Sequence, residues 1–92
     1  LAMAALLAAG IAGIEERLDL GPPAKGDVYK GKTAMLPTNL RDAREALLKS
    51  KMLRAAFSDD VVVHYGRAAE WEIEEHDRVV TDHEIARGFE RA

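Results

Sequence analysis

The sequence predicts an all-α fold, and three observations support this class. Hydrophobic residues make up 48% of the 92-residue chain, and alanine, the strongest helix former, fills much of that share. Aromatic residues contribute only 5%, which disfavours a sheet. Helix-start signals recur after residue 37. We therefore expect 1–92 to be one segment of three to four helices, joined by a single long loop that contains proline and glycine.

The first helix is expected over 1–19, and it carries no charge before Glu15. Gly10 and Gly13 each cost about 1 kcal/mol relative to alanine. They indicate either a close approach by another backbone or simply a weak point. An apolar run shorter than about 20 residues does not span a membrane, so this helix is expected to be buried on nearly all sides. The short chain has little mass to surround it, which indicates that covering material is missing.

Residues 20–38 are expected to form a loop. This stretch holds all three prolines and three of the seven glycines, and both residue types interrupt helices. A loop of this length inside a small domain is usually functional or mobile. Its one aromatic residue is Tyr29.

The next helix is expected over 39–49, where Thr38 or Asn39 would cap its amino end. Apolar residues at helical spacing support it: Leu40, Ala43, Leu47 and Leu48. Ser50 then caps a short helical turn expected over 51–57.

Two further helices are expected over 59–77 and 82–90. Ser58 is a capping residue, and the two aspartates after it oppose the positive end of the helix dipole. The three consecutive valines that follow could indicate a strand, but the run is short and the next residues do not alternate. Before the last helix, Thr81 stands three residues ahead of Glu84, the spacing of a capping box.

Charge and cysteine content restrict the partners and the compartment. The net charge is −3, and the thirteen Lys and Arg are spread among acidic neighbours instead of forming a basic stripe, which disfavours nucleic acid. The absence of cysteine excludes disulfides and thiolate chemistry and fits a reducing compartment. We expect a cytoplasmic protein with no nucleic-acid partner and no membrane partner.

The histidines are the first candidates for chemistry, as metal ligands. The residues concerned are His64, His76, Asp77, Asp82 and His83. None of them has the paired spacing on one helix face that zinc enzymes use. We expect these side chains to lie on a solvated surface, and we predict no metal site.

A group of glutamates is the second candidate, as acid–base carboxylates. Its members are Glu70, Glu72, Glu74 and Glu75. They alternate with Trp71 and Ile73 on a helix, so they point in different directions. A solvated face interrupted by a packed Trp71 is the expected structure. Phosphate-binding loops and nucleophile elbows are also missing from the sequence, so the residues predict no catalytic and no cofactor-binding position.

Three stretches, in order, resemble enzymes of the glutamine synthetase type. The family patterns are L-A-x-A-A-x-L-A-A-G-x-x-G-I-x-x-x-L, L-P-x-S-L-x-x-A-x-x-A-L and V-x-x-Y-x-x-x-K/R-x-x-E-W-x-x-x-x-x-x-V-T-x-W-E. The matching stretches are LAMAALLAAGIAGIEERL, LPTNLRDAREAL and VVVHYGRAAEWEIEEHDRVVTDHEIARGFE. Their order and spacing hold across nearly the whole chain. The resemblance implies the carboxy-terminal fragment of a larger α+β catalytic domain.

The resemblance also implies the chemistry of the parent enzyme. Such ligases use ATP and Mg²⁺ or Mn²⁺ to convert the side-chain carboxylate of glutamate into an acyl phosphate, which ammonia or another amine displaces. The family's metal-binding glutamates and substrate-binding arginines are expected upstream of Leu1. The fragment is therefore expected to be structural and inactive alone, with the rest of the parent domain as its partner and a homo-oligomer as the parent's state. The alternative is an independent helical interaction or oligomerisation module.

One regulatory site of the family falls within this chain. Some bacterial members are nucleotidylated on a tyrosine near N-L-Y-D-L-P, and Tyr29 lies in the equivalent loop. Lys30 and Gly31 follow it here, and its spacing to Leu36 differs from the family pattern. Two alternatives therefore remain for Tyr29: a site of modification, or an ordinary exposed or packing tyrosine.

The last helix departs from the family at two positions. His83 stands where the family usually has Trp, and Gly88 where it usually has Tyr. Each lost aromatic anchor would be worth about 1.5–3 kcal/mol if buried. These departures favour the broader group of glutamine synthetase-like enzymes, whose members join glutamate to polyamines or other amines.

Overall fold

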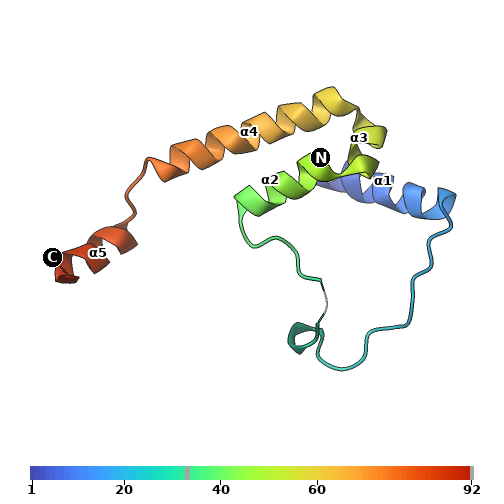
Figure 1. The fold of residues 1–92 in the computed structure, drawn as a ribbon, viewed down its shortest axis with the longest axis horizontal. Helices are drawn as coiled ribbons and strands as arrows, with labels where there is room; N and C mark the ends of the chain where they lie inside the picture. Colours follow the sequence, from blue (N-terminus) through green and yellow to red (C-terminus); the bar gives the residue numbers. More distant parts are fainter. Residues whose placement is uncertain (33, 92) are drawn as a thin grey trace.

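All regular secondary structure is helical in the part of the chain that the structure, a computed structural model, describes: residues 1–32 and 34–91. No strand occurs among these residues. The α-helices are α1 (Ala2–Glu15), α2 (Leu40–Lys49), α3 (Lys51–Phe57), α4 (Asp59–Asp77) and α5 (Asp82–Arg91) (Figure 1). The predicted all-α class is confirmed for this part of the chain, and the three consecutive valines lie within α4.

The helices do not close around one core. α2 and α4 pack side by side, α3 joins them, and α1 lies against α3. The loop between α1 and α2 hangs away from the helices as a wide arc, and α5 lies apart beyond the end of α4 (Figure 1). The Cα radius of gyration is 18.5 Å, against about 12 Å for a compact domain of this length.

Burial is confined to the contact between α2, α3 and α4. In the described parts of the chain only Val62 and Gly66 are buried, and both lie on α4. The chain exposes 8454 Å², whereas a compact monomer of this size exposes about 5,300 Å². The excess is the surface that a domain would normally bury.

Two predicted caps form at α2 and α3. Asn39 caps α2, since its Oδ1 accepts a hydrogen bond from the backbone N–H of Asp42 at 2.8 Å. Thr38, the other candidate, stands one residue outside the cap position. The Ser50 hydroxyl oxygen accepts from the N–H of Leu53 at 3.2 Å and begins α3. Side-chain caps satisfy N–H groups that have no partner in the first turn.

The first helix ends earlier than expected, at Glu15 and not at residue 19. Arg17 adopts a left-handed conformation with φ 51°. The N–H of Leu18 donates to the Gly13 carbonyl at 3.0 Å, and that of Arg17 to the Ile14 carbonyl at 3.2 Å. These two bonds form a Schellman motif, which closes a helix and turns the chain away. This helix end was not predictable from the sequence, because the left-handed position of such a motif usually holds glycine and here holds Arg17.

The prediction that the Ser58 side chain caps α4 is wrong. Ser58 does precede the helix, but its side chain makes no capping hydrogen bond, and its backbone lies at φ 78°, ψ 157°. Asp59 and Asp60 occupy the first turn as expected. The amino end of α4 is joined instead to Arg54, whose guanidinium lies 2.9 Å from a carboxylate oxygen of Asp59.

The long loop contains one turn of 3₁₀-helix, η1 (Val28–Lys30). The Asp27 carboxylate accepts a hydrogen bond from the N–H of Tyr29 at 3.0 Å and so starts this turn. The sequence indicated no helix here. A single turn still forms because it needs only a local cap and no long run of helix formers.

The capping box predicted before α5 is confirmed. The N–H of Glu84 donates to the Thr81 hydroxyl oxygen at 3.2 Å, and the N–H of Thr81 donates to the Glu84 carboxylate at 2.8 Å. The backbone hydrogen bond from Thr81, followed by the one from its hydroxyl, lowers the pKa of Glu84 below its usual 4.5. The ionised carboxylate is therefore the form that stabilises the start of α5.

Acidification is expected to loosen α5. The pKa of Glu84 is lowered in the folded chain, so its stabilising contribution is complete above pH 4.5 and is lost as the pH falls through the lowered value. Backbone chemical shifts of residues 82–89 measured against pH should report this loss. Glu84→Gln retains a neutral capping partner, so the pH step should shrink in that variant. A step of undiminished size would show that Glu84 is not its source.

Candidate functional site

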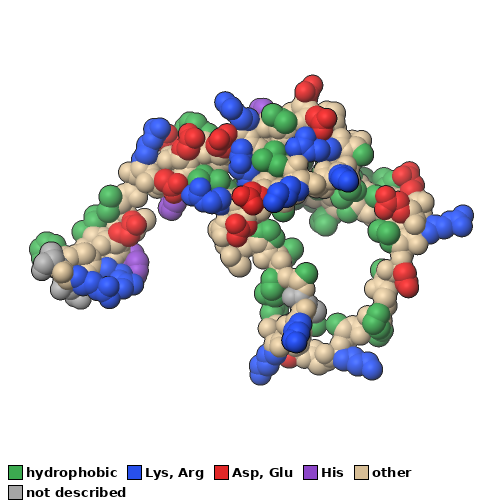
Figure 2. Space-filling view, in the orientation of Figure 1, with side chains coloured by type: hydrophobic (Ala, Val, Ile, Leu, Met, Phe, Trp, Pro, Cys, Tyr) green, Lys and Arg blue, Asp and Glu red, His purple; other side chains and the backbone are tan. Residues whose placement is uncertain are grey.

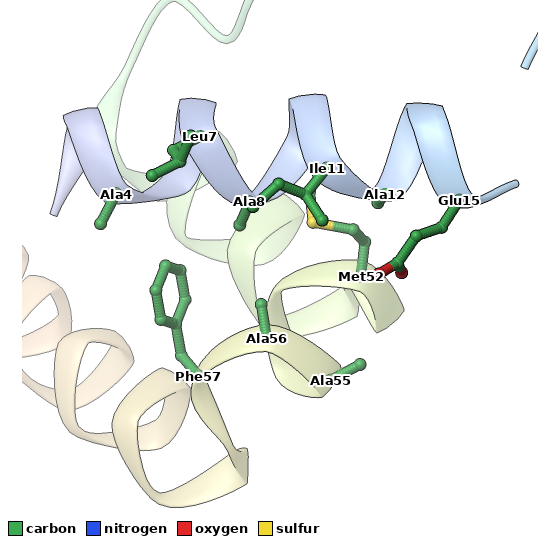
Figure 3. Close-up of a pocket in the computed structure, with 10 residues that line it drawn as sticks. All are labelled: Ala4, Leu7, Ala8, Ile11, Ala12, Glu15, Met52, Ala55, Ala56 and Phe57. Atoms are coloured by element: carbon green, nitrogen blue, oxygen red, sulfur yellow. The ribbon is translucent and has the colours of Figure 1, made fainter. Parts of the chain in front are cut away.

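An apolar groove of about 450 Å³ runs between α1 and α3 (Figure 3). Phe57 points from α3 toward α1, near Ala4 and Ala8, while Met52 extends toward the far half of α1 (Figure 3). The lining residues are Ala4, Leu7, Ala8, Ile11, Ala12 and Glu15 on α1, and Met52, Ala55, Ala56 and Phe57 on α3. Glu15 is the one charged residue among them. A groove of this chemistry fits an apolar protein surface better than a charged substrate.

The remaining faces of α1 are also apolar and uncovered. Leu6 is 75% exposed and Ile14 is 78% exposed, and no residue of α1 is buried. The expected burial on nearly all sides is therefore not achieved within this chain, because α1 packs mainly on α3. The exposure agrees with the interpretation that covering material is missing.

One side of the α2–α4 pair carries paired charges, and acidic and basic side chains gather there (Figure 2). Arg41 lies 3.0 Å from Asp77, and Arg44 lies 3.5 Å from Glu70. The Arg44 Nε also donates to the carbonyl of Gly66 at 2.8 Å. These bonds align the two helices and leave a polar face of the kind that solvent covers.

The other side of the same pair is an apolar groove of about 490 Å³. Its apolar lining residues are Leu1, Leu40, Ala43, Leu47, Tyr65, Ala68, Ala69 and Trp71, and the charged residues Arg44 and Glu72 also line it. Along α4 the apolar residues alternate, at helical spacing, with the charged residues of the first side. The helix pair thus has a polar face and an apolar face, as a helical layer on the surface of a larger domain would have.

Gly66 is the residue of this layer that sequence reasoning missed. A Cβ atom at this position would lie 2.8 Å from Leu48 Cδ2, so the glycine permits α2 and α4 to approach closely. A glycine inside a helix-forming stretch was the available signal. Gly10 and Gly13, which did attract attention, have no atom within 4 Å of such a Cβ in this chain.

The candidate metal ligands are divided between two helices. His76 and Asp77 lie at the end of α4, whereas Asp82 and His83 begin α5 after a four-residue linker. The His64 ring lies on α4 and contacts the Tyr65 ring edge-on at 5.4 Å. Within residues 1–32 and 34–91, no three His, Cys, Asp or Glu side chains are arranged to hold a metal ion.

The candidate acid–base glutamates include members of ion pairs. Glu70 lies 3.9 Å from Arg67 in addition to its contact with Arg44, and Glu75 lies 3.0 Å from Arg78. The expectation that Trp71 is packed is wrong, since it is 59% exposed. Trp71 lines the apolar groove beside α2, and Leu1 lines the same groove.

Tyr29 and the last helix both lie away from the packed helices. Tyr29 is 85% exposed on η1. On α5, Ile85 and Phe89 are exposed, and the position of Gly88 faces open space. No helix in the described part of the chain is long and apolar enough to cross a membrane.

Comparison with known proteins identifies the family. The family described as "Glutamine synthetase, catalytic domain" matches residues 1–88. The gamma-glutamylethanolamide synthetase of Streptomyces coelicolor is 47% identical over 91 residues, which is 99% of this chain and 20% of the relative. The glutamate–isopropylamine ligase of a Pseudomonas species is 33% identical, with 95% and 20% covered. The glutamine synthetase of Thermus thermophilus is 35% identical, with 95% and 21% covered.

These matches run over almost the whole chain, yet the chain spans only about a fifth of the length of the relatives. The chain therefore corresponds to one portion of each of these longer proteins. The resemblance seen in the three sequence stretches is confirmed: this chain belongs to the glutamine synthetase catalytic-domain family.

Proposed function

We propose that this chain is the carboxy-terminal structural segment of an ATP-dependent ligase that joins glutamate to an amine. The observation that carries the proposal is α1, a helix whose one charged residue is Glu15 at its end and which has no buried residue. Leaving such a surface in water is unfavourable by about 25 cal/mol per Å². The other four fifths of a ligase of the relatives' length would supply the cover.

In the proposed enzyme, α1 lies against the catalytic sheet and the charged side of α2 and α4 faces solvent. The parent would form the acyl phosphate of glutamate from ATP, and Mg²⁺ or Mn²⁺ would supply electrostatic stabilisation of the transferred phosphoryl group. The described residues offer no group that fits a metal ion. We assign them no role with ATP, metal or glutamate. The enzyme would be a cytoplasmic homo-oligomer.

The amine is proposed to be a small primary amine larger than ammonia. The names of two relatives support this choice: a gamma-glutamylethanolamide synthetase at 47% identity and a glutamate–isopropylamine ligase at 33% identity. The replacement of the family's usual aromatics by His83 and Gly88 points the same way. Ammonia is the alternative substrate, because a relative named as a glutamine synthetase is 35% identical to this chain.

A chimera tests the proposal directly. The matching 91 residues of the Streptomyces coelicolor relative would be replaced by those of this chain. We expect the chimera to consume ATP in the presence of glutamate, ethanolamine and magnesium, and the 92-residue chain alone to show no turnover. A folded but inactive chimera would contradict the proposal, and so would enzyme-like turnover by the chain alone.

Two glycines provide the matched control for packing in the chimera. In this chain Gly10→Leu meets open space and should be tolerated. In the chimera the same change should lower the melting temperature and the activity, because another backbone is expected to lie against α1. Gly88→Leu in the 92-residue chain, at a second open position, gives the effect of the change in helix propensity alone.

A further inference from the structure

The junction of α3 and α4 is an almost continuous helix with a single break. α3 ends at Phe57 and α4 begins at Asp59, so Ser58 alone separates them. The helical hydrogen bonds continue on both sides of the break. The N–H of Ser58 donates to the carbonyl of Arg54 at 2.9 Å, and the N–H of Val62 donates to the carbonyl of Ser58 at 3.3 Å. A change in the dihedral angles of this one residue would therefore make 51–77 a single helix.

The backbone conformation of Ser58 at the break is energetically unfavourable. Its φ of 78° with ψ of 157° lies in a region that essentially only glycine occupies without strain. The side chain recovers none of this cost, since it makes no capping hydrogen bond. The flanking sequence KMLRAAF contains strong helix formers. Local preferences on both sides thus favour the continuous helix, and the bent state must be held by tertiary contacts.

Arg54 makes polar contacts on both sides of the bend, beside the apolar contact between α3 and α4. Its Nε donates to the carbonyl of Leu48 at 2.9 Å, near the end of α2, where carbonyls lack helical partners. Its Nη1 lies 2.9 Å from Asp59 Oδ1, in the first turn of α4. One side chain on α3 therefore bonds to both neighbouring helices. In a continuous helix, Arg54 and Asp59 would diverge, because residues five apart do not share a face.

We propose that Ser58 is a hinge on which α3 moves relative to the α2–α4 pair, and that Arg54 is the latch that holds the bent state. α1 packs mainly on α3, with Phe57 and Met52 pointing toward it (Figure 3). The helix α1 therefore moves together with α3. The conformation of Ser58 therefore determines where the apolar surface of α1 lies relative to α2 and α4. This inference does not rest on the proposed function.

Spin-label distances test the hinge in the 92-residue chain itself. The sequence has no cysteine, so Lys51→Cys and Glu74→Cys, both exposed positions, accept a unique pair of labels. A continuous helix would place the two backbones about 34 Å apart, at 1.5 Å per residue. The bent chain should give a shorter distance. Labelled chains are diluted with unlabelled chains so that only distances within one molecule are measured.

Three variants distinguish the hinge from a rigid bend. Ser58→Ala favours the continuous helix through the higher helix propensity of alanine, and Arg54→Met removes the latch while leaving Ser58 unchanged. Both should move population from the short distance to about 34 Å. Ser58→Gly should keep the short distance and raise the melting temperature, since glycine relieves the strain. The control is Arg67→Met, whose ion pair lies within α4 and at 3.9 Å; it should leave the distances unchanged.

Several results would overturn the hinge. One is a double variant, Arg54→Met with Ser58→Ala, that retains only the short distance. Another is a lower melting temperature for Ser58→Gly than for the native chain. If Ser58→Ala does not fold, Arg54→Met alone still decides, because its backbone preferences are native at the junction.

Discussion

Gly66→Val is expected to separate α2 from α4 and to lower the free energy of unfolding by about 2–3 kcal/mol. The first added atom would already lie 2.8 Å from Leu48 Cδ2, and valine adds two more methyl groups at the same place. The displacement would also stretch the 2.8 Å bond from Arg44 Nε to the carbonyl of Gly66. Since Val62 is the one buried hydrophobic residue in the described chain, little other packing compensates.

Smaller and matched changes at glycine separate the clash from helix propensity. Gly66→Ala meets the mobile end of the Leu48 side chain but gains about 1 kcal/mol of helix propensity, so these effects should nearly cancel. Gly88→Val makes the valine change where no atom lies within 4 Å. Urea unfolding followed by circular dichroism gives all three values. Equal stabilities for the variants Gly66→Val and Gly88→Val would refute the close approach.

A double variant identifies the partner of the clash. Leu48→Ala removes the side chain that the added atoms would meet, so Gly66→Val combined with Leu48→Ala should be more stable than the sum of the two single effects predicts. The coupling energy for residues in contact is typically about 0.5–3 kcal/mol. Strict additivity would place the source of the destabilisation elsewhere.

The 92-residue chain alone is expected to self-associate through α1. Leu6 and Ile14 are each at least three-quarters exposed, and fully burying such a side chain is worth about 1.5–3 kcal/mol. Sedimentation velocity over a range of concentrations should show a rising average mass. Leu6→Lys together with Ile14→Lys should restore the monomer, because a charge in an apolar contact carries a large desolvation cost.

A matched control places the association on α1. Leu20 is 100% exposed in the loop, so Leu20→Lys makes the same chemical change outside the helix and should leave the association intact. A native chain that stays monomeric at all concentrations would contradict the idea that α1 lacks its cover. A single well-defined oligomer would instead favour the alternative of an independent oligomerisation module.

Helix positions and starts were predictable from the sequence because they depend on neighbouring residues. Asn39, Ser50 and Thr81 each cap through a side chain that reaches only three residues along the chain. The end of α1 was not predictable, since Arg17 takes a left-handed conformation that the sequence would assign to glycine. The surface chemistry of the glutamates was anticipated, but the exposure of Trp71 was not.

The sequence by itself determined the helical class, the family and the apolar character of α1, because composition, order of motifs and local caps are properties of the chain alone. Only the tertiary structure decided the break at Ser58, the close approach at Gly66 and the lack of cover on α1. These three depend on contacts with residues elsewhere in the chain: Arg54 bonds to two helices, Leu48 fills the space beside Gly66, and α3 covers only part of α1. Patterns among neighbouring residues in the sequence do not reveal contacts between residues that lie far apart along the chain.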